Sequence, residues 1–163
     1  NLKLTGSGEP TPLTGMGVLG NFFHVLGVEP ELGRSFTKDE TVKGGRAVVL
    51  LSHAYWERQF GGDRGIVGRS ITLNGTPTTV VGVLPETFDF GAAFAPGSKV
   101  DVFEPTILDD IRNEGNTLAL IGRLKPGVSV AQSQGKRRRC FPSFTGAKNI
   151  RIRWGIIRRG LSS

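Results

Sequence analysis

The chain has 163 residues, 37% of them hydrophobic, which suits one domain with a substantial core, and it has neither a transmembrane-length apolar run nor a recognisable signal peptide. The net charge of +7 is uneven: residues 1–134 hold 12 basic and 14 acidic residues, whereas residues 135–163 hold nine basic residues and no acidic one. The basic character therefore belongs to the C-terminal segment, and a single cysteine, Cys140, excludes an internal disulfide framework and a multi-cysteine metal site.

The N-terminal part of the sequence predicts short elements joined by turns. Residues 1–14 are expected to form a short extended piece followed by a loop rich in Gly, Pro and Thr. The next apolar residues predict a helix of about two turns, with Asn21 as its N-cap and Gly27 at its end. Thr37 is expected to cap a further short helical turn.

A continuous apolar run at residues 46–52 is the first strong strand signal. Its length and lack of polar alternation predict a strand that is buried on both faces of a sheet. Ser52 is then expected to cap a helix that ends at Gly61 and Gly62. The apolar residues of that helix, which we expect to be buried, are Tyr55, Trp56 and Phe60.

The middle of the chain contains a clear hairpin signal. Alternating apolar residues flank Asn74-Gly75, and these two residue types tolerate the positive φ angles of a tight hairpin turn. Further strands are predicted within residues 100–107 and 117–124, and an amphipathic helix is predicted to begin at residues 128–134. Four or five strands with short helices predict an α+β fold with a mixed, largely antiparallel sheet.

Residues 135–163 differ from the rest of the chain. Gly135 and Pro142 interrupt the predicted helix, and no apolar periodicity follows. The segment is either a natural basic tail or the product of a shifted reading frame, and we expect it to be disordered. The basic residues that we expect to make nonspecific contacts with anions are Lys136, Arg137, Arg138, Arg139, Arg151 and Arg153.

Three glycines have the spacing of a dinucleotide-binding turn, Gly15-x-Gly17-x-x-Gly20. Such a turn needs a buried strand before it, a long helix after it and an acidic residue at the end of the next strand. Here two prolines precede the glycines, the predicted helix is short, and Asp39 and Glu40 lie in a polar turn. We therefore predict no cofactor and interpret the glycines as a flexible lead into the helix.

The remaining reactive side chains do not form a recognisable catalytic pattern. His24 and His53 lie near helix starts, and neither shows the several converging ligands that a metal site needs or the orienting partner that a catalytic base needs. Ser52 and Ser70 lack the Gly-x-Ser-x-Gly turn of a serine hydrolase. The sequence predicts no catalytic residue and no metal site, and hence no enzyme.

Three stretches carry a resemblance to a known family. They are NFFHVLGVEPELGRSF at residues 21–36, the long stretch from VVLLSHAYWERQF to LPETFDF at residues 48–90, and IGRLKPGVSVAQ at residues 121–132. Together they resemble the periplasmic core domain of MacB-type ABC transporter permeases, most closely the soil-bacterial branch. After Gln134 the family continues its helix with Ala and Glu, whereas this chain reads GKRRRCFPSF, which favours a truncated or frameshifted gene copy.

The resemblance implies a porter-like, non-catalytic domain on the extracytoplasmic side of the inner membrane, occupying residues 1–134. It implies transmission of ATPase-driven motion to substrates or partner proteins outside the membrane. The implied partners are the permease transmembrane segments, an ABC ATPase subunit and a periplasmic adaptor, with a dimer as a further option. The alternative is a stand-alone protein that binds nucleic acid or anionic surfaces through residues 135–163, although specific nucleic-acid recognition is not expected.

Overall fold

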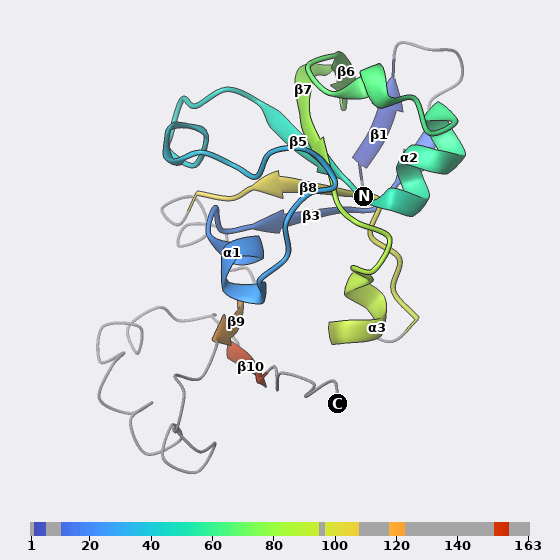
Figure 1. Ribbon diagram of the computed structural model, residues 1–163. Helices are drawn as coiled ribbons and strands as arrows, with labels where there is room; N and C mark the ends of the chain where they lie inside the picture. Colours follow the sequence, from blue (N-terminus) through green and yellow to red (C-terminus); the bar gives the residue numbers. More distant parts are fainter. Residues whose placement is uncertain (1, 6–10, 95–96, 108–117, 123–151, 157–163) are drawn as a thin grey trace, which may run out of the picture. The chain divides into compact units, whose positions relative to one another are not determined.

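The computed structural model describes residues 2–5, 11–94, 97–107, 118–122 and 152–156. The chain divides into two compact units, residues 1–107 and 108–163, which are described separately. The first unit is built on an eight-stranded sheet (Figure 1). Its elements in chain order are β1 (Leu2–Thr5), β2 (Thr11–Leu13), β3 (Gly15–Val18), α1 (Phe22–Leu26), β4 (Leu32–Gly33), η1 (Lys38–Glu40), β5 (Val48–Leu51), α2 (His53–Phe60), η2 (Arg64–Ile66), β6 (Ser70–Leu73), β7 (Thr76–Val83), α3 (Phe90–Phe94) and β8 (Val102–Pro105).

The sheet has the strand order β2-β1-β6-β7-β5-β8-β3, and β4 pairs with β7 beside this path. Two of the pairings, β5 with β7 and β3 with β8, are parallel, and the others are antiparallel. The predicted α+β fold with a mixed, largely antiparallel sheet is therefore confirmed. The expected number of strands is too low, because the short N-terminal strands depend on pairing with distant segments rather than on local β-propensity.

The strongest local signals of the sequence all form the expected elements. All four residues of β5 are buried, so this strand is packed on both faces as predicted. Asn74 and Gly75 join β6 to β7 with φ angles of 49° and 83°, as a tight hairpin turn requires. Ser52 caps α2, since its Oγ accepts a hydrogen bond from the Tyr55 amide at 3.3 Å.

The prediction for the start of α1 needs a correction. Asn21 occupies the N-cap position, but its side chain makes no capping hydrogen bond and its backbone is not extended (φ −93°, ψ 5°). An N-cap side chain reaches the second or third amide of the helix from extended backbone, which Asn21 does not adopt. Gly27 ends the helix in the left-handed conformation, as expected.

The segment before α1 is also different from its prediction. Gly15–Val18 is strand β3, parallel to β8, and Thr11–Leu13 is strand β2, antiparallel to β1. Neither segment is the loop that its glycines and prolines indicate. Both strands lie at the ends of the sheet, where a proline or a glycine interrupts fewer ladder hydrogen bonds than it would in a central strand.

The sheet has a hydrophobic cluster on each of its two faces. Successive residues of β5 point to opposite faces, and all four are buried, so this strand contributes to both clusters. Val49 and Leu51 belong to the cluster that packs under α2, called here the α2 face. Val48 and Leu50 belong to the opposite cluster, called here the phenylalanine face. The other buried residues are, on the α2 face, Leu4, Leu13, Tyr55, Trp56, Ile66, Ile71, Leu73, Val80, Val83 and Val102, and, on the phenylalanine face, Val18, Phe23, Phe36, Val81, Leu84 and Phe103.

In the second unit, two described strands pair with each other. Strand β9 (Leu118–Gly122) runs parallel to β10 (Ile152–Ile156), with Leu118 opposite Ile152. β9 lies within its predicted segment, and β10 lies inside the segment predicted to be a basic tail. The helix predicted from residue 128 lies outside the described residues, and the division of the chain after residue 134 stays a prediction. Within the described part of the chain, no helix has both the length and the hydropathy to span a membrane.

Candidate functional site

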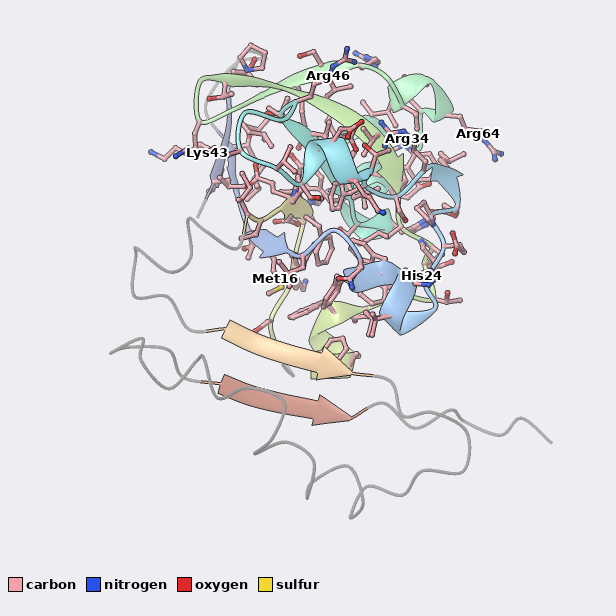
Figure 2. The ribbon with its side chains drawn as sticks, turned by 90° about the vertical axis from the view of Figure 1, so that its left-hand side faces the viewer. Met16, His24, Arg34, Lys43, Arg46 and Arg64 are labelled. Atoms are coloured by element: carbon pink, nitrogen blue, oxygen red, sulfur yellow. The ribbon has the colours of Figure 1, made fainter. Side chains whose placement is uncertain are left out.

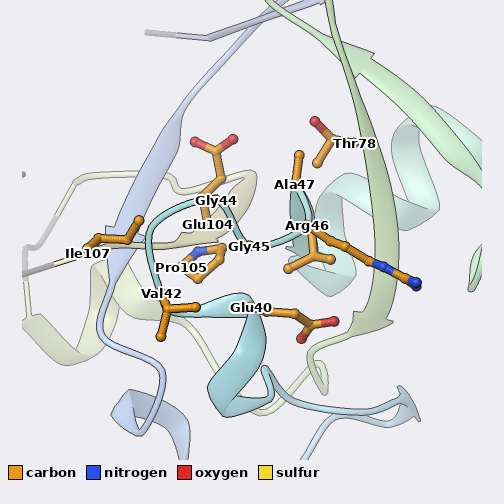
Figure 3. A pocket seen from close by; sticks show the side chains of 11 residues that line it. Glu40, Val42, Gly44, Gly45, Arg46, Ala47, Thr78, Glu104, Pro105 and Ile107 are labelled. Carbon is orange, nitrogen blue, oxygen red and sulfur yellow. The ribbon is translucent and has the colours of Figure 1, made fainter.

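A hollow of about 290 Å³ lies where the loop before β5 meets the ends of β7 and β8 (Figure 3). The loop is tight: Gly44 has a φ of 80°, and a Cβ on Gly45 would lie 2.6 Å from the carbonyl oxygen of Asp39. A side chain at position 45 would therefore push the loop out of place. The residues that line the hollow are Glu40, Val42, Gly44, Gly45, Arg46, Ala47, Val48, Thr78, Glu104, Pro105 and Ile107.

Glu104, from β8, is the half-buried acid in the wall of this hollow. Burial raises the pKa of its carboxyl group above the usual value, because the charged form loses hydration. Arg46 extends away from Glu104 in Figure 3, and among the described residues no donor bonds to this carboxylate. A single carboxylate with no oriented partner can neutralise a cation, but it does not form a general acid–base pair.

Glu40, the second acid of the hollow, has a structural partner. Its carboxylate accepts hydrogen bonds from Arg34 at 2.6 and 2.9 Å and from the Thr37 amide at 2.9 Å. The Arg34 hydrogen bond is the main reason why the pKa of Glu40 is lowered to about 2. The bidentate pair closes the loop between β4 and η1, which contains the buried Phe36. Both carboxylate oxygens of Glu40 are therefore already hydrogen-bonded within the protein.

His53 forms the other polar pair of note, at the start of α2. Its Nδ1 contacts the carboxylate of Glu31, and its ring packs against Trp56 with centroids 5.5 Å apart. The hydrogen bond to Glu31 raises the pKa of His53. No orienting partner is predicted for His53, and this prediction is wrong. Glu31, which lies 22 residues earlier and approaches through β4, contacts the ring, and Glu57, four residues later on α2, also favours the charged form. His24 is exposed on α1 (Figure 2).

The described residues contain no group of three or more His, Cys, Asp or Glu side chains that could hold a metal ion. Gly15 and Gly17 lie in a strand, so they do not form the strand-to-helix turn that holds a pyrophosphate. Arg153 lies in β10 opposite Ala119. The rest of the predicted anion-contact set lies outside the described residues, so anion binding stays a prediction; those residues are Lys136, Arg137, Arg138, Arg139 and Arg151.

Comparison with known proteins places the fold. The chain is similar to the periplasmic region of MacB from Actinobacillus actinomycetemcomitans, with a TM-score of 0.60 and 18% identity over 90% of this chain and 64% of that one. It is also similar to the extracellular domain of the noncanonic ABC-type transporter YknZ from Gram-positive bacteria, with a TM-score of 0.49 and 20% identity over 69% of this chain and 52% of that one. The chain thus spans between half and two thirds of these solved chains.

A comparison with curated proteins finds no match. The family comparison, in contrast, matches residues 2–138 to the MacB-like periplasmic core domain. This match includes every strand of the eight-stranded sheet, and it also includes β9 of the second unit. The resemblance seen in the sequence is confirmed, and the chain belongs to the MacB-like periplasmic core domain family.

Proposed function

We propose that this domain is the non-catalytic extracytoplasmic part of an ABC transporter permease, and that it passes ATPase-driven motion to substrates or partner proteins outside the membrane. The observation that supports this role, beside the family match, is the packing of the sheet on both faces. Val49, Leu50 and Leu51 are fully buried at the centre of the sheet. A close-packed interior of this kind deforms little, so the unit can be displaced as one body.

The partners that fit this role are the permease transmembrane segments, an ABC ATPase subunit and a periplasmic adaptor. Motion enters such a domain through the chain segments that connect it to its neighbours and leaves through its surface. A rigid sheet suits this task because two sites on the same body keep their separation while the body moves. The half-buried Glu104 has no acid–base partner among the described residues, which agrees with a mechanical role.

The test uses a MacB-type permease whose periplasmic core domain is replaced by this chain. Spin labels at Val42→Cys and Arg64→Cys, in a Cys140→Ser background, report the distance between two exposed positions of the first unit. We expect this distance to stay constant when ATP is added while ATP-dependent export continues. Phe23→Ala, which loosens the core, should lower the rate of export more than it lowers the rate of ATP hydrolysis. A distance that changes with ATP, or export that tolerates the loosened core, would contradict the proposal.

A further inference from the structure

Two polar side chains from neighbouring elements lie where the α2-face cluster ends and the hollow begins. Glu104 follows Val102 by two residues on β8, and Thr78 precedes Val80 by two residues on β7. Because side chains alternate along a strand, each is directed to the same face as its buried neighbour, and both valines belong to the α2-face cluster. Glu104 and Thr78 also line the hollow. The hollow therefore continues the interior of the sheet on this face, with a carboxyl and a hydroxyl group in place of aliphatic side chains.

Glu104 has no cation beside it among the residues that the structure describes. Its side chain is half-buried, and a carboxylate that loses hydration is stable only when a cation or hydrogen-bond donors replace the water. Arg46, which lines the same hollow, extends away from Glu104 (Figure 3), and Arg34 is bound to Glu40. Lys43, in the loop before β5, extends away from the sheet (Figure 2). The charge of Glu104 thus calls for a cation from outside this part of the chain.

The rest of the wall decides what kind of cation fits. Val42 is 53% exposed, so this part of the wall is open to solvent. A divalent metal needs several oxygen ligands, and the described residues contain no group of three side chains that could hold one. A single carboxylate beside aliphatic surface suits an ammonium group on a hydrocarbon chain instead. The aliphatic lining residues are Val42, Ala47, Val48, Pro105 and Ile107.

The hollow is formed away from the ends of the sheet. Its lining residues come from η1, the loop before β5, and the segments of β5, β7 and β8, and none of them belongs to β1, β2 or β3. Backbone hydrogen bonds hold the loop: the Gly45 amide donates to the carbonyl oxygen of Val42 at 2.9 Å, and the Thr41 amide donates to that of Lys38 at 3.1 Å. A wall that is already ordered loses little conformational entropy when a ligand binds.

From these observations we propose that the hollow is a binding site for a primary alkylammonium group, with the Glu104 carboxylate as its counter-ion and the aliphatic wall against its carbon chain. The Thr78 hydroxyl donates to the carbonyl oxygen of Thr76 at 3.1 Å, so its lone pairs can accept a second N–H of the ammonium group. A lysine side chain of a partner protein and a small free amine both carry this group. The site does not rest on the mechanical role proposed above.

Binding of the ammonium group and ionisation of Glu104 are linked. Burial raises the pKa of this carboxyl group, and a bound cation lowers the pKa because it favours the charged form. The ammonium group therefore binds more tightly above the pKa of Glu104 than below it. Glu40, the other acid of the hollow, has a pKa of about 2 and stays charged over this range, as does Arg46. The pH dependence of binding is thus assigned to Glu104.

An NMR titration of the full 163-residue chain with n-butylammonium tests the site, with n-butanol as the neutral control of the same chain length. The methyl signals of Val42, Ala47 and Ile107 should shift and saturate in the millimolar range, and the pKa of Glu104 should fall. Butanol should bind about fivefold more weakly or less tightly still. Equal binding of butanol would overturn the proposal. A pKa of Glu104 at or below its ordinary value before amine is added would also overturn it, because a cation of the chain would already pair with the carboxylate.

Two variants separate a local ion pair from the general potential of the surface. Glu104→Gln keeps the shape of the side chain and should weaken butylammonium binding about fivefold or more. Asp39→Asn, at an exposed position outside the lining, should change the affinity less than about twofold. Equal losses in both variants would overturn the proposal. If Glu104→Gln does not fold, the unmodified chain decides the question, since binding that persists unchanged below the pKa of Glu104 would equally overturn it.

A second ligand distinguishes the two sources of the ammonium group. Lysine that is blocked at its amino and carboxyl ends presents the same group on the same length of chain, attached to a peptide backbone. Binding as tight as that of butylammonium would assign the site to a lysine side chain of a partner protein. Binding of butylammonium alone would assign it to a free amine. Either result supports the site, and failure of both ligands to bind would overturn it.

Discussion

The two faces of the sheet are stabilised in different ways. On the α2 face, an eight-residue helix covers aliphatic strand residues, and local hydrogen bonds hold it at both ends. Ser52 caps its start, Gly61 ends it in the left-handed conformation, and the indole nitrogen of Trp56 donates to the carbonyl oxygen of Asp63 at 2.9 Å. These contacts join residues that are close in the sequence.

On the phenylalanine face, two five-residue helices and several loops contribute aromatic rings instead. Phe23 is completely buried at the centre of these rings, with four ring centroids between 5.2 and 6.3 Å away. Its ring neighbours come from α1, the segment after β4, the loop before α3, and β8; they are Phe22, Phe36, Phe88 and Phe103. This face therefore depends on contacts between distant segments, and its short helices are not expected to be stable alone.

The largest effect should follow from removing the central ring. Phe23→Ala should lower the free energy of unfolding by about 3–5 kcal/mol, because it leaves a cavity between four other rings. Phe23→Leu, which retains most of the volume, should cost about half as much or less. Equilibrium urea unfolding monitored by circular dichroism measures both. A loss below about 1 kcal/mol for the alanine variant would show that this face is not a packed core.

The next effect concerns the ion pair that closes the loop over Phe36. The pKa of Glu40 is lowered from 4.5 to about 2 in the folded protein, so its pairing with Arg34 stabilises the fold above pH 4.5 and is lost as the pH falls toward 2. Glu40→Gln should cost about 2 kcal/mol at pH 7, a value that allows for the half-exposed guanidinium group.

The pH profile distinguishes this ion pair from a simple packing effect. The difference between the wild type and Glu40→Gln should shrink below pH 4.5 and approach zero near pH 2. Urea unfolding at pH 7, 5, 4 and 3 measures this difference. Asp39→Asn, at the exposed neighbouring position, is the matched control and should change stability little. A pH-independent difference would contradict the electrostatic explanation.

The same contrast explains which features the sequence could predict. The β6–β7 hairpin, strand β5 and the caps of α2 follow from residues within a few positions of each other, and all were predictable. Strands β2 and β3 were not, because their glycines and proline disfavour strands locally and only pairing with β1 and β8 stabilises them. These two segments are strands because of pairing with segments that lie elsewhere in the sequence, not because of their own residues.

The polar sites show the same limit. The capping arrangement of Thr37 and Glu40 has a local spacing, so the short helical turn was predictable. The pairing of His53 with Glu31 was not, because it depends on β4 bringing a distant loop to the start of α2. The isolated burial of Glu104 in β8 has no sequence signal at all, since a single acid near a strand end usually reaches solvent.

A pair of cap variants compares the two faces directly. Ser52→Ala removes the side-chain acceptor at the start of α2 and should cost about 1 kcal/mol. Asn21→Ala, at the same position of α1, should cost almost nothing, because the Asn21 side chain makes no capping bond. Urea unfolding of both variants under the same conditions makes the comparison. Equal losses would mean that α1 also depends on a local cap.

The smallest effect on stability should come from the contact between Glu31, in the segment before β4, and His53, at the start of α2. Glu31 lies between α1 and β4, where its amide donates to the carbonyl oxygen of Val83 at 2.9 Å, and its carboxylate contacts His53 at the start of α2. The hydrogen bond to Glu31 raises the pKa of His53 above the usual 6.5. The stabilisation is therefore complete below pH 6.5 and is lost as the pH rises through the raised pKa.

Because both side chains are partly exposed, Glu31→Gln should lower stability by less than about 1 kcal/mol at pH 6 and by less still at pH 8.5. Urea unfolding at the two pH values, with an NMR titration of His53 in both proteins, measures the coupling. In Glu31→Gln the pKa of His53 should fall relative to the wild type. An unchanged pKa would contradict this link between the start of α2 and the segment before β4.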